Sequence, residues 1–220
     1  HLSDDAILLI HLGMSGALYL QDSASPLKKH EHIVFQFANL PNSELRYLDI
    51  RRFGSIHLIQ SPPHTHRLLC KLGVEPLTDA FSADFLHTSC QQKKCAIKPL
   101  IMNQAIVVGV GNIYASEALF LSKLHPTTLA CRLSHTQCQE LVVQIKSILH
   151  HAIRLGGSTL KDFVNPDAKP GYFQQTLHVY GRKALPCHLC QTPVERIELG
   201  QRASFFCPKC QPAPQELTSE

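Results

Sequence analysis

The chain has 220 residues, of which 44% are apolar and 17% charged, and its formal net charge is +4. No apolar run approaches the twenty or so residues of a membrane-spanning helix, and the first residues lack the basic flank of a secretory signal. Neither a membrane protein nor a secreted one is therefore expected. Nine cysteines, only four of them at metal-binding spacing, favour a reducing compartment. The modest positive charge suits a polyanionic partner, but it also suits many metabolic enzymes.

The first sixty residues predict short antiparallel strands, rich in β-branched and aromatic residues and separated by Gly, Pro, Asn or Ser. In HIVFQFA apolar and polar residues alternate, as in a strand with one buried face. The expected strands are AILLIHLG at 6–13, GALYLQD at 16–22, HIVFQFAN at 32–39, SELRYLDI at 43–50 and GSIHLI at 54–59. We therefore expect a β domain over residues 1–60.

A helical pattern follows SPPHTH at 61–66, which interrupts the run of strands. Ser82 is expected to cap one helix, and Ser134 with Gln137 forms the capping box of another. Behind that box an apolar residue recurs every four positions, which predicts the buried stripe of a long helix. The members of this stripe are Leu141, Ile145, Leu149 and Ile153. The helical domain is expected to span residues 61–165.

Two Cys-x-x-Cys pairs stand near the C-terminus, with sixteen residues between them. They are formed by Cys187, Cys190, Cys207 and Cys210. This spacing is typical of a structural zinc site with four thiolate ligands, where the metal folds a hairpin that is too small for a core of its own. Two disulfide pairs are the alternative. The preceding TLHVYG, at 176–181, predicts a strand that leads into this module.

A glycine turn lies in VVGVGNIYASEALF at 107–120. A dinucleotide-binding fingerprint would need a third glycine at the position of Tyr114. What remains is a turn that opens a helix, with Asn112 as the expected cap. Such a turn offers backbone N–H groups and the positive end of a helix to an anion. A turn between helices without any ligand is the alternative.

The same run resembles the helix–two-turn–helix motif of bacterial formamidopyrimidine-DNA glycosylases. Other stretches resemble further signatures of this family in the same order, and the similarity extends from residue 11 to residue 211. These stretches are HLGMSG at 11–16, RRFG at 51–54, GSTLKDF at 157–163, KPGYF at 169–173, VYGRK at 179–183 and QRASFFCPKCQ at 201–211. The chain is identified on these motifs as a member of the branch that acts on oxidised purines.

The resemblance implies an α+β multidomain fold. A partial N-terminal antiparallel β-sandwich would precede the helical domain, followed by a base-capture loop with a zinc-finger hairpin at 166–212 and a flexible tail at 213–220. The implied activity is that of a DNA glycosylase and abasic-site lyase, which excises 8-oxoguanine and formamidopyrimidines from double-stranded DNA. The lyase would then nick the strand by β,δ-elimination. One structural zinc ion, a monomer and a location in the bacterial cytosol or nucleoid are also expected.

An enzyme of this kind turns the target nucleotide out of the duplex. The resemblance assigns the filling of the vacated space to Met14, Arg51 and Phe53. A flexible thioether, a planar cation and an aromatic ring suit that task. Judged without the resemblance, ordinary packing at a strand end is the stronger interpretation of Met14 and Phe53.

Contacts with DNA are assigned by the resemblance to His30, Arg51, Lys93 and Asn112. For Lys93 the alternative is a solvated end of a helix. KPGYF resembles the loop that closes over the flipped base. The residues expected to act in this loop are Lys169, Gly171, Tyr172 and Phe173, and the glycine would supply freedom at a hinge.

Arg202 stands between the two cysteine pairs, in QRASFFC. The resemblance implies that the zinc hairpin delivers this arginine to the DNA backbone beside the lesion, where it takes part in δ-elimination. A hairpin fixed by one metal is a stiff support for a charge. An arginine that caps a neighbouring carbonyl group is the alternative.

Members of this family attack the sugar with an N-terminal proline, helped by a glutamate and a lysine. HLSDDAILLI instead matches the strand before HLGMSG, so these three residues are not expected among the present 220. We therefore expect this chain alone to form no efficient covalent adduct with an abasic site. The alternatives are a non-catalytic protein that binds damaged DNA and a member of the sister branch that acts on oxidised pyrimidines. HLGMSG and KPGYF favour the purine branch.

Overall fold

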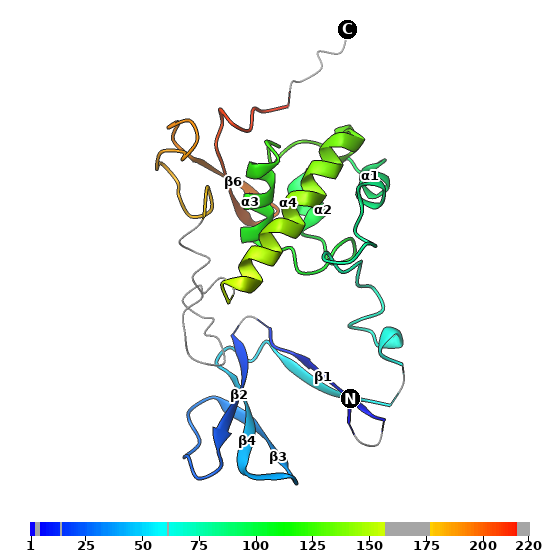
Figure 1. Cartoon of the computed structure of the whole chain (residues 1–220), viewed down its shortest axis with the longest axis vertical. Coiled ribbons are helices and arrows are strands. Elements are labelled where there is room, and N and C mark those ends of the chain that lie inside the picture. The colour runs from blue at the N-terminus through cyan, green and yellow to red at the C-terminus, as the bar shows by residue number, and fades with distance from the viewer. Residues whose placement is uncertain (3–4, 14, 61, 157–176, 215–220) are drawn as a thin grey trace. The chain divides into compact units, whose positions relative to one another are not determined.

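The computed structural model describes residues 1–2, 5–13, 15–60, 62–156 and 177–214 (Figure 1). The chain forms two compact units. The first is built mainly on His1–Cys70, and the second on Lys71–Ile153 together with the described residues from 177 onward. No helix among the described residues combines the length and the apolar character needed to cross a membrane.

The described residues of unit 1 contain the five predicted strands and a 3-10 turn, η1 (Pro63–Thr65). The strands are β1 (Ile7–His11), β2 (Gly16–Asp22), β3 (Glu31–Phe37), β4 (Leu40–Asp49) and β5 (Ser55–Ile59). β1 pairs with β5, and β4 lies between β2 and β3 in a second sheet, all antiparallel. The register of β2 and β4 places Gly16 opposite Asp49, so the end of β4 meets the start of β2. The predicted antiparallel β domain is confirmed.

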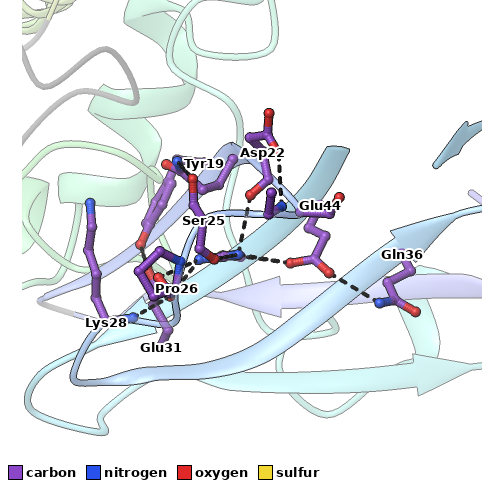
Figure 2. Close-up of polar contacts among 12 residues, drawn as sticks. Tyr19, Asp22, Ser25, Pro26, Lys28, Glu31, Gln36 and Glu44 are labelled. Carbon is purple, nitrogen blue, oxygen red and sulfur yellow. Dashed lines mark hydrogen bonds and ion pairs between the residues drawn. The ribbon is translucent and has the colours of Figure 1, made fainter. Parts of the chain in front are cut away.

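A buried arginine ties the connection between β2 and β3 to the sheet (Figure 2). The guanidinium of Arg46 on β4 contacts the carboxylates of Glu31 at 3.2 Å and Glu44 at 3.0 Å. It also donates to the backbone carbonyls of Ser25 at 2.7 Å and Pro26 at 3.2 Å. A buried guanidinium is costly unless its N–H groups and its charge are matched. The cluster therefore fixes the path of the residues between β2 and β3.

Unit 2 contains the predicted helices and a C-terminal hairpin, which lies beside α3 in Figure 1. Its elements are α1 (Ala83–Cys90), α2 (Ile97–Ile101), α3 (Asn112–Leu121), η2 (Ala130–Arg132), α4 (His135–Arg154), β6 (Glu195–Leu199) and β7 (Arg202–Phe206). The predicted combination of an antiparallel β domain, a helical domain and a cysteine-rich hairpin is confirmed.

The predicted helix starts of α1 and α4 are confirmed by side-chain caps. Ser82 Oγ accepts the N–H of Phe85 at 3.1 Å. Ser134 Oγ accepts the N–H of Gln137 at 3.2 Å, while Gln137 Oε1 accepts the N–H of Ser134 at 2.9 Å. This reciprocal pair is a capping box, and it satisfies two N–H groups that the first turn of α4 leaves without helical partners.

The predicted buried stripe of α4 is wrong at its last member. Leu141, Ile145 and Leu149 are buried, but Ile153 is 65% exposed. Each step of four residues turns about 40° beyond a full circle, so a strict four-residue repeat drifts around the helix. Steps of three correct this drift, and the buried line accordingly continues through Ile148 and Ala152.

The predicted strand in TLHVYG is also wrong where the structure describes it, because residues 177–181 form a bend and a turn. The carboxylate of Glu117, in the middle of α3, accepts the N–H groups of this segment. Oε2 accepts from His178 at 2.8 Å, and Oε1 accepts from Val179 at 2.9 Å and Tyr180 at 2.8 Å. These N–H groups are therefore not available to a neighbouring strand. Burial would raise the pKa of Glu117, but the hydrogen bonds outweigh burial and lower it.

Candidate nucleic-acid interface and metal centre

The four cysteines of the two predicted pairs converge, with all Sγ atoms within 4.8 Å of one another. Sγ of Cys190 lies 3.4 Å from that of Cys207 and 3.5 Å from that of Cys210, and Cys187 lies 3.9 Å from Cys210. Tetrahedral zinc with Zn–S bonds of about 2.3 Å places its sulfurs about 3.8 Å apart. A disulfide would need about 2.05 Å. The cluster therefore fits a four-thiolate zinc ion and leaves no position open for water.

The metal cluster is joined to the C-terminal end of α3. Cys187 and Cys207 are buried against Phe120, Val179 and Val194. Gln211 adds a polar link, because Oε1 accepts the N–H of Cys207 at 3.0 Å and Nε2 donates to the carbonyl of Leu124 at 2.7 Å. The thiolate knuckles are thus held by the helical part of unit 2 as well as by the metal they would bind.

Arg202 is the first residue of β7 and follows a two-residue turn. Gly200 and Gln201 have φ angles of 55° and 60°, and Leu199 pairs with Arg202 across the turn. Two successive positive φ angles are typical of the tight type I′ turn. The side chain of Arg202 is exposed, and its guanidinium makes no hydrogen bond or ion pair with any residue that the structure describes. Among these residues it therefore caps no carbonyl group.

A groove of about 240 Å³ lies beside this turn. It is lined by Lys98, Pro99, Met102, Leu199, Gly200 and Arg202. The groove combines a free guanidinium with residues of α2, so the hairpin and the helix contribute to one concave surface within unit 2.

Lys98 connects α2, α3 and the hairpin through a buried ammonium group. Its side chain is 1% exposed, and Nζ donates to Asn112 Oδ1 at 2.7 Å, Ser204 Oγ at 2.7 Å and the carbonyl of Ala203 at 3.0 Å. All three N–H groups of an ammonium are thereby satisfied. Burial lowers the pKa of Lys98 to about 8.

Asn112 is the expected cap of α3, and this prediction is wrong. Gly111 occupies the capping position, where no side chain bonds the first turn of the helix. Asn112 is the first helical residue, and its side chain is used elsewhere. Its Oδ1 accepts from Lys98, and its Nδ2 donates to the carbonyl of Ala203 at 3.0 Å. Asn112 and the residue after Arg202 are therefore bonded directly to each other.

Lys93 lies in the turn after α1 with an exposed side chain. Its N–H donates to the carbonyl of Cys90 at 3.1 Å, and its carbonyl accepts the N–H of Cys131 at 3.2 Å. The backbone is thus fixed while the ammonium group stays in solvent, which is the arrangement that a phosphate contact needs.

The RRFG turn carries the candidate residues of unit 1. Arg51 and Phe53 are both exposed, and the guanidinium carbon of Arg51 lies 4.8 Å from the centre of the Phe53 ring. This distance is within the range of a cation–π contact. His30 precedes β3 with a φ of 73°, and its ring lies edge-on to that of His32 at 6.2 Å.

Five predicted site residues lie outside the described residues. They are Met14, Lys169, Gly171, Tyr172 and Phe173.

Two buried ionisable residues, Lys98 and Glu117, were not among the predicted site residues. Each is a single charged residue within an apolar run, IKPLI for Lys98 and ASEALF for Glu117. A charge in such a run is rarely buried without a partner, so this pattern could have drawn attention to both. The identity of the partners could not be read from the sequence, because they lie far away in the chain.

Three family models match the chain. The formamidopyrimidine-DNA glycosylase N-terminal domain matches residues 1–56, the formamidopyrimidine-DNA glycosylase H2TH domain matches residues 72–164, and the zinc finger found in FPG and IleRS matches residues 184–213. A formamidopyrimidine-DNA glycosylase of Hydrogenovibrio crunogenus is 52% identical over 209 residues, which are 95% of this chain and 74% of that protein. This chain belongs to the formamidopyrimidine-DNA glycosylase family.

Solved structures of the family have the same fold. The MutM (FPG) protein of Thermus thermophilus matches with a TM-score of 0.86 and 34% identity, over 97% of this chain and 78% of that chain. The Lactococcus lactis Fpg in complex with DNA that contains an abasic site matches with a TM-score of 0.85 and 33% identity, over 96% and 76%. Together with the converging thiolates, the family's zinc finger shows that this chain binds one structural zinc ion.

Freshly purified, reduced protein is expected to hold one zinc ion per chain, measured by inductively coupled plasma mass spectrometry. Stripping the metal with a chelator should weaken binding to duplex DNA by roughly tenfold, because the hairpin has too little core to fold without it. Fluorescence anisotropy with labelled duplex measures this change, and added zinc should reverse it. Reduced protein that contains no metal would contradict the site.

The variant Lys98→Met is expected to weaken duplex binding several-fold and to lower the free energy of unfolding by about 2 kcal/mol, because three acceptors, of which Ser204 is buried, lose a charged donor. Anisotropy titrations and urea denaturation measure the two effects. Lys71→Met removes the same charge from an exposed side chain and is the matched control. Equal losses of affinity in the two variants would show that only net charge matters.

Proposed function

We propose that this protein is a base-excision-repair enzyme that flips out and excises oxidised purines from double-stranded DNA and then cleaves the abasic site. Membership of the formamidopyrimidine-DNA glycosylase family supports the glycosylase and lyase activities. The single observation that carries the proposal is the arrangement around Lys98. Lys98 bonds Asn112 to the hairpin at Ala203, and the guanidinium of the preceding Arg202 has no partner among the described residues with which it would have to part to meet an anion.

In unit 2, Arg202, Asn112 and Lys93 are proposed to contact the DNA backbone. A guanidinium can form two parallel hydrogen bonds with a phosphate, and its charge is independent of pH in the physiological range. Arg202 is therefore suited to hold the phosphate beside the abasic sugar and to stabilise the negative charge of the group that leaves in δ-elimination. The stiff hairpin supports this role because the backbone that carries the guanidinium needs no ordering when DNA binds.

In unit 1, Arg51 and Phe53 are proposed to enter the space that the flipped nucleotide vacates, together with Met14. The exposure of Phe53 supports this role, since 57% of a large apolar side chain faces solvent. Stacked aromatic and guanidinium groups can replace the lost base-stacking contacts. His30 is proposed to contact a phosphate, and Lys169, Gly171, Tyr172 and Phe173 are proposed to close over the extruded base.

The protein is further proposed to act as a monomer in the bacterial cytosol, on nucleoid DNA. Its DNA substrate and its family support this location. The division into residues 1–60, 61–165, 166–212 and 213–220 is likewise proposed as the division into functional modules.

The substrate class is tested with the complete gene product on duplexes that carry 8-oxoguanine, a formamidopyrimidine, an oxidised pyrimidine or no lesion. We expect cleavage of the two purine lesions, slower cleavage of the pyrimidine lesion and none of the intact strand. Borohydride should trap the enzyme covalently on an abasic site, because the lyase step passes through a Schiff base. Faster excision of the pyrimidine lesion would indicate the sister branch. Binding without any cleavage would indicate a non-catalytic protein.

The variant Arg202→Ala is expected to weaken binding to abasic-site DNA by roughly tenfold. The slope of log affinity against log salt concentration should fall in magnitude by about one, because one phosphate contact is lost. The product of β-elimination should accumulate at the expense of the δ-product, which denaturing gels resolve by the mobility of the cut strand. Arg196→Ala removes an exposed charge from β6 of the same hairpin and serves as the control. An unchanged ratio of the two products in Arg202→Ala would rule out its role in δ-elimination.

A further inference from the structure

Asp49 ends β4 beneath the two loops of unit 1 that contain HLGMSG and RRFG. Its side chain is buried, with 1% of the residue exposed. Oδ1 accepts the hydroxyl of Ser15 at 2.7 Å, and Oδ2 accepts the N–H of Gly54 at 2.8 Å and the hydroxyl of Tyr47 at 3.1 Å. The Ser15 hydroxyl oxygen in turn accepts the N–H of Arg51 at 3.1 Å. One carboxylate therefore joins both loops to the strand.

The backbone of Asp49 holds a third segment. Its N–H donates to the carbonyl of His30 at 3.0 Å, and its carbonyl lies 2.9 Å from Nε2 of His32. Every described position of unit 1 that is proposed to meet DNA is therefore attached to this residue. His30 is bonded to it directly, Arg51 is bonded through Ser15, and Phe53 immediately precedes the bonded Gly54.

The two loops are also in close backbone contact, which leaves no room for an alternative packing. Gly13 has a φ of 63°, and a Cβ there would lie 2.7 Å from the carbonyl carbon of Phe53. A Cβ at Gly54 would overlap the hydroxyl of Tyr47 and approach the carbonyl of His11 to 2.7 Å. Glycine is required at both positions, and the carboxylate of Asp49 is the acceptor that this close packing surrounds.

The charge of Asp49 is used only for accepting hydrogen bonds within the described part of unit 1. Burial would raise its pKa, but hydrogen bonds from Ser15, Gly54, Tyr47 and the amide of Arg51 outweigh burial and lower the pKa to about 2. The carboxylate therefore stays ionised at neutral pH, and an ionised carboxylate can only accept. It fixes the direction of each donor that surrounds it.

We propose that Asp49 is a positioning residue for base extrusion, which holds Arg51, Phe53 and His30 in the geometry that they need before DNA arrives. The inference rests on the proposed function of these three residues. Unstacking a base costs several kcal/mol. Binding free energy that is not used to order the loops remains available for opening the duplex. Loss of the carboxylate should therefore impair recognition of a lesion more than binding to undamaged DNA, which depends on phosphate contacts.

The test uses Asp49→Asn in the complete gene product. The amide has the same size, but its NH₂ group cannot accept from Gly54 or Tyr47. The measured quantity is the ratio of the Kd for intact duplex to the Kd for duplex with a tetrahydrofuran abasic-site analogue. We expect this ratio to fall about tenfold while the Kd for intact duplex changes less than about twofold. A 2-aminopurine opposite the analogue should show a smaller fluorescence increase on binding, because the loops insert less often.

Glu44→Gln is the matched control, since Glu44 is another buried carboxylate on β4 but bonds to Arg46 and Gln36, and Arg46 keeps its ion pair with Glu31 and its bonds to Ser25 and Pro26 in this variant. It should retain both the ratio and the fluorescence signal. Ser15→Ala removes the hydroxyl that donates to Asp49 and accepts from Arg51 but leaves the bonds of Asp49 to Gly54 and Tyr47, so we expect a smaller fall of about threefold. If Asp49→Asn does not fold, the Ser15→Ala variant tests the positioning role of Asp49 in its place.

An unchanged ratio in a folded Asp49→Asn, or an equal fall in Glu44→Gln, would overturn the proposal. If Asp49→Asn does not fold, an unchanged ratio in Ser15→Ala would do so. Failure of the wild-type protein to prefer the analogue would instead refute the proposed function.

Discussion

The arrangement of unit 2 depends on the burial of one ammonium group. Because removing a charge from water is costly, a buried lysine is stable only where each of its N–H groups finds an acceptor. The acceptors of Lys98 belong to α3 and to β7, so these two elements are held in one relative position. The guanidinium of Arg202, one residue before Ala203, takes its own position from that constraint. The zinc cluster fixes the far end of the hairpin, and Lys98 fixes the end that carries the charge.

Buried carboxylates hold segments without regular structure in place, as the buried ammonium group holds α3 and β7. Backbone N–H groups in loops need acceptors, and neither sheet nor helix provides them there. Glu117 accepts three consecutive N–H groups of the segment that leads to the zinc module. Asp49 accepts from both exposed loops of unit 1. In each case the pKa is lowered despite burial, which shows that the surrounding donors are arranged for the ionised form.

The features that the sequence predicted correctly depend on neighbours in the chain. The box of Ser134 with Gln137 and the spacing of the cysteine pairs involve residues a few positions apart, so a local pattern is enough to find them. HIVFQFA forms the predicted strand, but its expected single buried face is wrong, because Ile33 and Phe37 are exposed. Two of the wrong predictions involve distant partners. Asn112 gives its amide to a carbonyl 91 residues away instead of capping its helix. Val179 bonds to a carboxylate 62 residues away instead of joining a strand. The candidate roles of Arg202, Arg51 and His30 came from the family resemblance, whereas the residues that hold them in place appeared only in the structure.

The bonds from Lys98 to the hairpin also limit how freely this segment can be exchanged between proteins. A transplanted hairpin would bring its four thiolates and its tight turn, so it would keep the ligands of its metal ion. Its arginine, however, would lose this support, because the lysine that bonds the neighbouring Ala203 lies 105 residues before Ala203 in the chain. The zinc module therefore carries its own metal ligands but not the group that fixes the position of Arg202. Recombination between relatives should preserve the position of Arg202 only where α2 and the hairpin are inherited together.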